Sequence, residues 1–95
     1  MKIDNFKEIL DKIENYSSTH PSYWGCALAG EVGEACNLIK KHERDNKDIK
    51  KELSFELADC FNYLVLIAKF YDINLEAAIF EKLEILKERR NKIKE

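Results

Sequence analysis

Two pairs of carboxylates have the spacing with which helices build metal sites. Glu31 and Glu34 form one pair, Glu56 and Asp59 form the other, and the partners in each pair are three residues apart. Residues three apart on a helix lie on the same face. Both pairs border apolar stripes, so their charges need compensation by a cation or by hydrogen-bond donors. The four groups are therefore a candidate site for a hard metal ion.

The ligand types indicate which ion this would be. Mg²⁺ prefers oxygen ligands, keeps several waters and is commonly shared between carboxylates and substrate phosphates. His20 and His42 lie outside both pairs, so the sequence has neither the E-x-x-H spacing of di-iron bundles nor a ligand set for zinc. A single E-x-x-E is common on solvated helix faces, but two such pairs on successive helices favour Mg²⁺, with Mn²⁺ as the alternative.

Composition indicates one helical domain. The chain has 95 residues, of which 36% are charged and 45% hydrophobic, with one proline and three glycines. This length supports a single core, so we interpret residues 1–95 as one domain. The net charge of −2 gives no general attraction to nucleic acid or to a membrane surface. Without an apolar run near the ~18 residues that span a bilayer, and without a secretory signal pattern, we expect a cytoplasmic protein with neither partner.

The apolar spacing predicts four helices and no strand. The helices are expected at about 3–16, 23–44, 48–71 and 75–93, separated by cap and turn residues at 17–22, 45–48 and 72–74. The run 45–48 (DNKD) supplies N-cap candidates for the third helix, and Asn74 is the candidate N-cap for the fourth. The predicted fold is an all-α four-helix bundle.

The glycines and cysteines lie within these predicted helices. Gly30 and Gly33 flank Glu31, and each glycine costs about 1 kcal/mol relative to alanine in a helix interior. Close packing against a neighbouring helix and room for a ligand both explain them, and the two explanations are compatible. The three cysteines lie among apolar residues without C-x-x-C spacing, which favours reduced core thiols over ligands or disulfides; they are Cys26, Cys36 and Cys60.

The third predicted helix is apolar on more than one side, which is typical of a helix shared between subunits. Four of its residues would form an exposed patch that three neighbouring helices cannot cover; they are Phe55, Tyr63, Leu66 and Phe70. Exposed patches of this kind mark interfaces, and a two-fold arrangement would bury this one against its own copy. We therefore expect a homodimer at least, with a tetramer as the alternative.

The stretch AGEVGEACNLIKK (29–41), followed by ELADCFNYL (56–64), resembles the signature of the MazG-like, all-α nucleoside triphosphate pyrophosphohydrolases. The resemblance covers residues 20 to 90, and the four carboxylates match the E-x-x-E and E-x-x-D of that family position for position. It implies hydrolysis of a nucleoside triphosphate to a monophosphate and pyrophosphate, for nucleotide-pool control or house-cleaning. It also implies that Mg²⁺ is held by the four carboxylates and that the chain forms dimers or tetramers.

Two positions depart from the family pattern. The family often has a lysine where Leu53 stands, and an asparagine in the last helix near Leu86. Phosphate contacts must then come from other cations, and the aromatic and amide groups near the motifs are further substrate-binding candidates. Trp24 would stack on the base or belong to the core, and Asn62 would bind the ligand or a carboxylate or contact a helix. The cationic candidates are Lys40, Lys41, Arg44 and Lys82.

Two readings compete with a hydrolase. One is a catalytically weak helical module that binds a nucleotide or a partner protein in the same groove. The other is a structural bundle whose acids are neutralised by lysines. The products formed from nucleoside triphosphates in the presence of Mg²⁺ distinguish the three.

Overall fold

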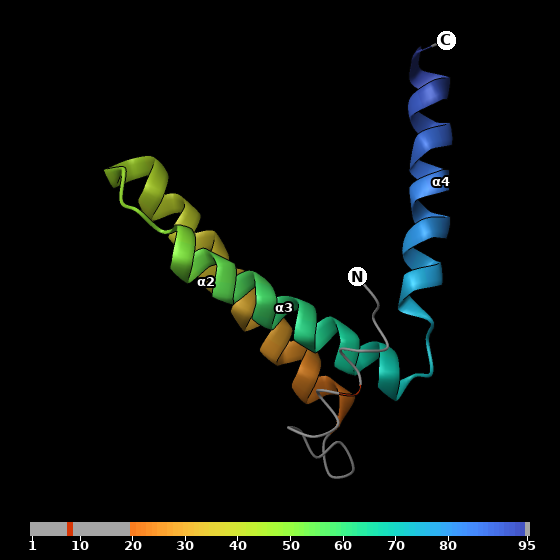
Figure 1. The fold of residues 1–95 in the computed structure, drawn as a ribbon, viewed down its shortest axis with the longest axis horizontal. Helices are drawn as coiled ribbons and strands as arrows, with labels where there is room; N and C mark the ends of the chain where they lie inside the picture. The colour runs from red at the N-terminus through yellow and green to blue at the C-terminus, as the bar shows by residue number, and fades with distance from the viewer. Residues whose placement is uncertain (1–7, 9–19, 95) are drawn as a thin grey trace.

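A computed structural model describes residue 8 and residues 20–94 (Figure 1). Within this part of the chain the secondary structure is entirely helical, in the order α2 (Pro21–Asp45), α3 (Lys50–Phe70) and α4 (Leu75–Lys94). The all-α prediction is confirmed for these residues, and the predicted helix boundaries differ from the observed ones by at most two residues. The helix predicted at 3–16 lies outside the described residues, apart from the single helical residue Glu8.

Helices α2 and α3 pack side by side as an antiparallel hairpin (Figure 1). Pro21 occupies the first turn of α2, where backbone N–H groups have no partner within the helix, so the missing N–H of proline costs no hydrogen bond. At the other end, Asn46 adopts a left-handed conformation with φ 54°, and its N–H donates to the carbonyl of His42. The N-cap of α3 is Ile49 rather than a residue of the expected run 45–48, although Asp48 Oδ1 accepts a hydrogen bond of 3.3 Å from the N–H of Lys50. This short loop fixes the register in which the two acidic motifs face each other.

The main core lies between the first half of α2 and the second half of α3. Trp24 is only 4% exposed and is clustered with Val65 and Leu66. Its ring meets the ring of Phe70 edge to face, with the centroids 5.5 Å apart. Nearer the hairpin loop, a smaller set of buried apolar residues fills the space between the helices; it comprises Ala35, Leu38 and Ile49. The hairpin is thus held at both ends, with the acidic motifs between.

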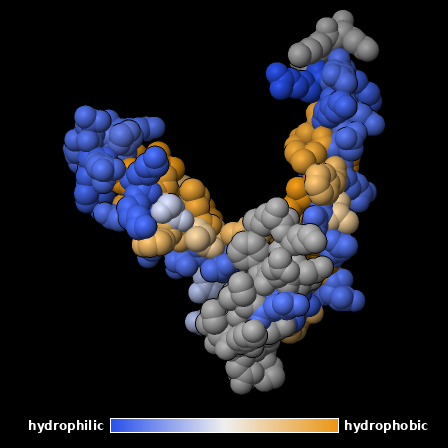
Figure 2. All heavy atoms as spheres, in the orientation of Figure 1, coloured by the Kyte–Doolittle hydropathy of each residue, from blue (hydrophilic) through white to orange (hydrophobic). Residues whose placement is uncertain are grey.

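Helix α4 extends away from the hairpin (Figure 1). The side chain of Asn74 accepts a 3.0 Å hydrogen bond from the N–H of Ala77, which confirms Asn74 as the N-cap. Leu75 packs against the main core, but the following apolar residues of α4 are exposed; they are Ile79, Phe80, Leu83, Ile85 and Leu86. Figure 2 shows apolar atoms on the side of α4 that faces the hairpin. The described helices therefore do not close into the bundle that the sequence predicts.

The prediction of an exposed apolar patch on α3 is partly wrong. Leu66 is buried and Tyr63 is half-buried against the main core, so neither belongs to an exposed patch. Phe55 and Phe70 are exposed as expected, and the ammonium of Lys51 lies 4.8 Å above the centre of the Phe55 ring. The larger exposed apolar surface is on α4, because the hairpin covers only the first turn of that helix.

The small residues of α2 also differ from expectation. A Cβ built on Gly25, Gly30 or Gly33 meets no heavy atom within 4 Å apart from the local helix backbone, so packing against the residues that the structure describes does not require them. The cysteines are free, but Cys26 and Cys36 are exposed rather than in the core, and only Cys60 is half-buried. The second explanation for the glycines, room beside Glu31, is the one that agrees with this structure.

Candidate metal and substrate site

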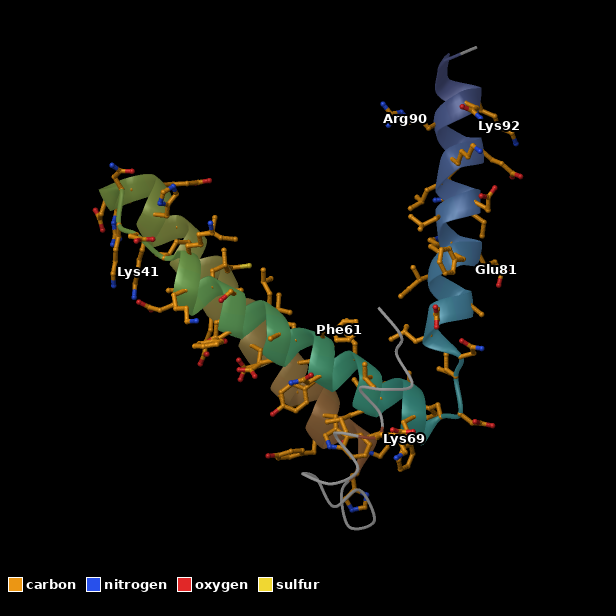
Figure 3. All side chains as sticks on the ribbon, viewed as in Figure 1. Lys41, Phe61, Lys69, Glu81, Arg90 and Lys92 are labelled. Carbon is orange, nitrogen blue, oxygen red and sulfur yellow. The ribbon has the colours of Figure 1, made fainter. Side chains whose placement is uncertain are left out.

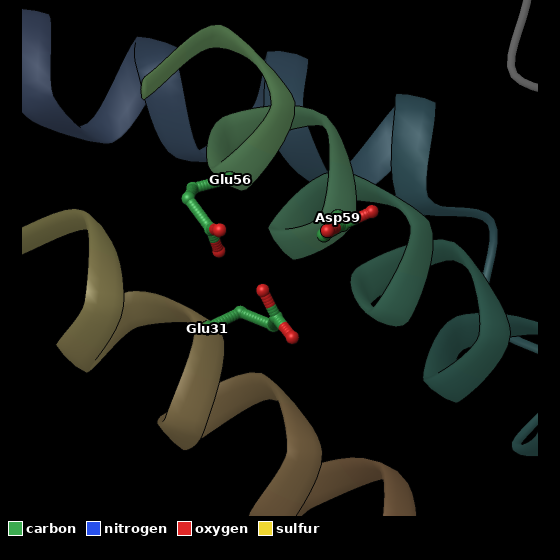
Figure 4. A group of neighbouring side chains, drawn as sticks. All are labelled: Glu31, Glu56 and Asp59. Carbon is green, nitrogen blue, oxygen red and sulfur yellow. The ribbon is translucent and has the colours of Figure 1, made fainter. Parts of the chain in front are cut away.

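Three carboxylates from the two helices of the hairpin converge on one point (Figure 4). One oxygen from each of Glu31, Glu56 and Asp59 lies within 4.8 Å of the other two. Glu31 is seven residues before the buried Leu38, and Glu56 is seven residues after the buried Ile49. Each glutamate therefore lies on the same side of its helix as a buried apolar residue. Asp59 lies one turn further along α3. The helix packing that buries these apolar residues therefore brings the acids together.

Glu56 is the least compensated member of this group. Its Oε2 atom is buried and accepts no hydrogen bond from any residue that the structure describes. The side-chain contact with Glu31, followed by desolvation, raises the pKa of Glu56 from 4.5 to about 7, and Glu34 raises it further. A buried carboxylate oxygen without a donor, next to two other acids, is the environment that a hard divalent cation compensates. Glu31, Glu56 and Asp59 thus form a group that could hold a hard divalent cation.

Glu34 lies beside this group and not within it. Glu34 is not among the three residues whose oxygens lie within 4.8 Å of one another. Its carboxylate is nevertheless close enough to Glu56 to raise the pKa of Glu56. Burial and the charges of Glu31, Glu56 and Asp59 raise the pKa of Cys60, so this thiol stays protonated and is a poor metal ligand. The expected four-carboxylate set is therefore arranged as three converging groups with Glu34 adjacent.

A pocket of about 250 Å³ opens next to Glu34 and Glu56. Its remaining lining residues are Asn37, Leu38, Lys41 and Glu52. Sequence reasoning selected Lys41 but missed Asn37 and Glu52. Helical spacing gives a signal for both, since Asn37 follows Glu34 by three residues and Glu52 precedes Glu56 by four.

The cations predicted to contact phosphates have different environments. Lys41, at the hairpin end of α2 (Figure 3), lines the pocket and makes no ion pair with the residues that the structure describes. Arg44 binds Asp45 with an N–O distance of 2.7 Å and does not line the pocket. Lys40 is exposed outside the pocket, and Lys82 is exposed on α4. Of the four candidates, the structure brings only Lys41 to the carboxylates.

The two other predicted substrate-binding residues are also outside the pocket. Trp24 is enclosed by the main core, where its ring packs, and its stacking on the base stays a prediction. Asn62 is half-buried on α3, one turn beyond Asp59, and does not line the pocket.

Comparison with protein families agrees with the arrangement of the acids. Residues 18–94 match the MazG nucleotide pyrophosphohydrolase domain. The chain belongs to the MazG family. Comparison with curated proteins and with solved structures gave no significant match. Among the described helices of this MazG domain, none is long and apolar enough to cross a membrane.

Proposed function

We propose that this MazG domain is a Mg²⁺-dependent pyrophosphohydrolase that converts a nucleoside triphosphate and water into a nucleoside monophosphate and pyrophosphate. The observation that carries the proposal is the convergence of Glu31, Glu56 and Asp59, with the buried and unpaired oxygen of Glu56 among them. Family membership supports the reaction class. Nucleotide-pool control or house-cleaning in the cytoplasm is the role that this reaction serves.

The residues of the site have separate roles in the hydrolysis. Glu31, Glu56 and Asp59 would hold Mg²⁺, which when bound would neutralise phosphate charge and make a water more acidic. Glu34, beside this group, orients the attacking water and accepts its proton. The water oxygen bonds to the α-phosphorus, the bond from that phosphorus to the bridging oxygen breaks, and pyrophosphate leaves.

Product analysis tests this function. The purified protein is incubated with canonical and modified nucleoside triphosphates and either Mg²⁺ or Mn²⁺, and the products are separated by chromatography. Monophosphate plus pyrophosphate supports the proposal. Diphosphate plus orthophosphate contradicts the site of cleavage. Nucleotide binding without turnover would support the alternative, a catalytically weak binding module.

We also propose that the chain assembles with copies of itself, as a dimer or a tetramer. Support comes from α4, whose apolar residues beyond Leu75 have no cover from the described part of the chain. Exposed apolar residues on the hairpin offer a matching surface; they include Val32, Ile39, Leu57 and Leu64. A second copy is the occupant that provides both surfaces at once, since a two-fold axis would place each α4 against the partner's hairpin.

A further inference from the structure

Two cavities near the hairpin loop differ in their relation to the metal site. One, of about 340 Å³, has a mainly apolar lining that contains none of the four motif carboxylates; it is formed by Ile39, His42, Asp48, Ile49, Lys50 and Leu53. The other is the pocket of about 250 Å³ that shares Glu34 and Glu56 with the site. Pockets for whole drug-sized ligands occupy roughly 300–1,000 Å³, so this one suits a part of a nucleotide. Of these two cavities, only the second shares residues with the carboxylate site.

The charges of the pocket indicate which part of the nucleotide it takes. Its lining carries three carboxylates, from Glu34, Glu52 and Glu56, and one ammonium group, from Lys41. A pyrophosphate tail placed here would face an excess of negative charge, and Glu52 lies outside the group that would hold the metal. A nucleobase is uncharged and carries both donors and acceptors, so it matches a lining of mixed polarity. The pocket therefore suits the base, with the phosphates at Glu31, Glu56 and Asp59.

The polar groups of the lining distinguish between bases. The two oxygens of a carboxylate can accept from two adjacent donors, and an ammonium donates. Guanine is the common base whose pairing edge has two adjacent donors, N1–H and N2–H₂, next to an acceptor, O6. Adenine and cytosine present a single donor group on that edge, and uracil presents one donor between two acceptors.

We propose that this pocket binds the nucleobase of the substrate and selects guanine, with Glu52 accepting from N1–H and N2–H₂ and Lys41 donating to O6. The proposal rests on the proposed function, because it names the substrate class of the same site. Leu38 supplies an apolar contact for the ring, and the amide of Asn37 is a further donor and acceptor at the edge. Glu52 and Lys41 thereby become specificity-determining residues.

Glu52 also has an ordinary structural role, which the experiment must separate from recognition. It lies in the first turn of α3, where a negative charge interacts favourably with the helix dipole. Loss of that interaction would lower the free energy of unfolding of the protein by the same amount whichever nucleotide is used. A change in the preference for guanine over adenine cannot arise from it.

The experiment compares guanine and adenine nucleotides in the wild-type chain and in the variants Glu52→Gln and Lys41→Gln. Glu43→Gln, which removes a negative charge from an exposed position of α2 outside the pocket, is the matched control. The readouts are kcat/KM for GTP and ATP with Mg²⁺, and the Kd of their non-hydrolysable α,β-methylene analogues. We expect the wild type and the control to prefer guanine, and Glu52→Gln to lose about tenfold or more of that preference, because a bond to a charged group is removed. Lys41→Gln should weaken the binding of the guanine nucleotide more than the binding of the adenine nucleotide.

The outcomes separate this inference from the proposed function. Equal kcat/KM and equal Kd for the two bases in the wild type would overturn it, and so would a guanine preference that survives both substitutions. In either case, release of monophosphate and pyrophosphate would leave the hydrolase proposal standing. Conversely, guanine-selective binding of the analogues that depends on Glu52, without any turnover, would support the base pocket and overturn the hydrolase.

Discussion

At the residue scale, Glu56 connects metal binding to stability. Replacing Glu56 by glutamine keeps the shape of the side chain and removes one of three converging charges. Activity should fall about 100-fold or more, because metal ions supply several kcal/mol of transition-state stabilisation. The melting temperature of the metal-free protein at pH 8 should rise, since repulsion within the group is relieved.

Steady-state kinetics and thermal unfolding with and without Mg²⁺ measure both effects. In the wild type, Mg²⁺ should raise the melting temperature, and in Glu56→Gln this shift should largely disappear. The exposed Glu43→Gln variant controls for the loss of a charge in general. Full Mg²⁺-dependent turnover in Glu56→Gln would show that this residue is not a ligand.

The raised pKa of Glu56 predicts how metal-free stability changes with pH. The pKa rises from 4.5 to about 7 on folding, so between these values the folded protein binds more protons than the unfolded chain. The free energy of unfolding therefore decreases as pH rises through this window, and the contribution of Glu56 is fully present only below pH 4.5.

Urea titrations of the chelator-treated protein from pH 4 to 8 measure this dependence, with Glu56→Gln as the comparison. The difference in stability between the two proteins should change steadily across the window in favour of the variant. A difference that is independent of pH would contradict the raised pKa.

The sequence was informative about the site to the extent that the site depends on helical spacing. The i, i+3 pairs bring Glu31, Glu56 and Asp59 together as their spacing predicts, because apolar rows on the same helices determine which way the acids point, and their role as ligands stays a prediction. The roles of the cations were not predictable in this way. Whether a lysine reaches a pocket depends on the register between α2 and α3, and a neighbouring acid such as Asp45 can bind an arginine first.

At the scale of the element, α2 contains glycines that its own packing does not require. Gly30 is in the helix interior with a negative φ, and a Cβ there would meet no side chain of the residues that the structure describes. Gly30→Ala should therefore raise the free energy of unfolding by about 0.5–1 kcal/mol, because the unfolded chain loses conformational freedom. Denaturant titration measures the change.

Activity of the same variant tests why the glycine is there. If Gly30 leaves room for the ligand beside Glu31, KM should increase while stability improves. Improved stability with unchanged KM would contradict the ligand explanation, and a loss of stability would indicate that a neighbour absent from the described chain approaches this position.

The packing of α2 against α3 depends most on Trp24. Its ring is buried among Val65, Leu66 and Phe70, so Trp24→Ala should lower the free energy of unfolding by about 3–5 kcal/mol. Tyr23→Ala, at a neighbouring position that is 63% exposed, is the control and should change stability little. Denaturant titration of both variants gives the comparison, and a small effect at Trp24 would favour the stacking role instead.

Helix positions were predictable here because local signals determine them, and helix contacts were not. Pro21, Asn46 and Asn74 mark helix ends through their own backbone and side-chain chemistry. The apolar residues of α4 follow a helical pattern whether they pack within the chain or on another copy. The prediction of a four-helix bundle therefore stays a prediction, because periodicity alone does not decide which helices pack together.

At the scale of the whole molecule, the exposed face of α4 is the feature that the single chain leaves incomplete. Phe80 is 63% exposed, and α4 packs on the hairpin only through its first turn. Burial of apolar surface stabilises by about 25 cal/mol per Å², so covering several such side chains from two symmetric copies gives a substantial drive to associate. Because the hairpin that α4 would cover also carries the carboxylates, assembly and activity should be linked.

Light scattering at micromolar concentration should give two or four times the chain mass of 11.2 kDa. Phe80→Asp should shift the protein to monomers without unfolding α2 and α3, because Phe80 is 63% exposed and lies outside the main core of the described residues. Glu81→Gln, which changes one charge at the adjacent exposed position (Figure 3), should keep the wild-type mass. The monomeric variant should also lose activity, since the partner's α4 would no longer lie beside the site. A wild-type monomer with full turnover would contradict the link between assembly and catalysis, while leaving the metal site in place.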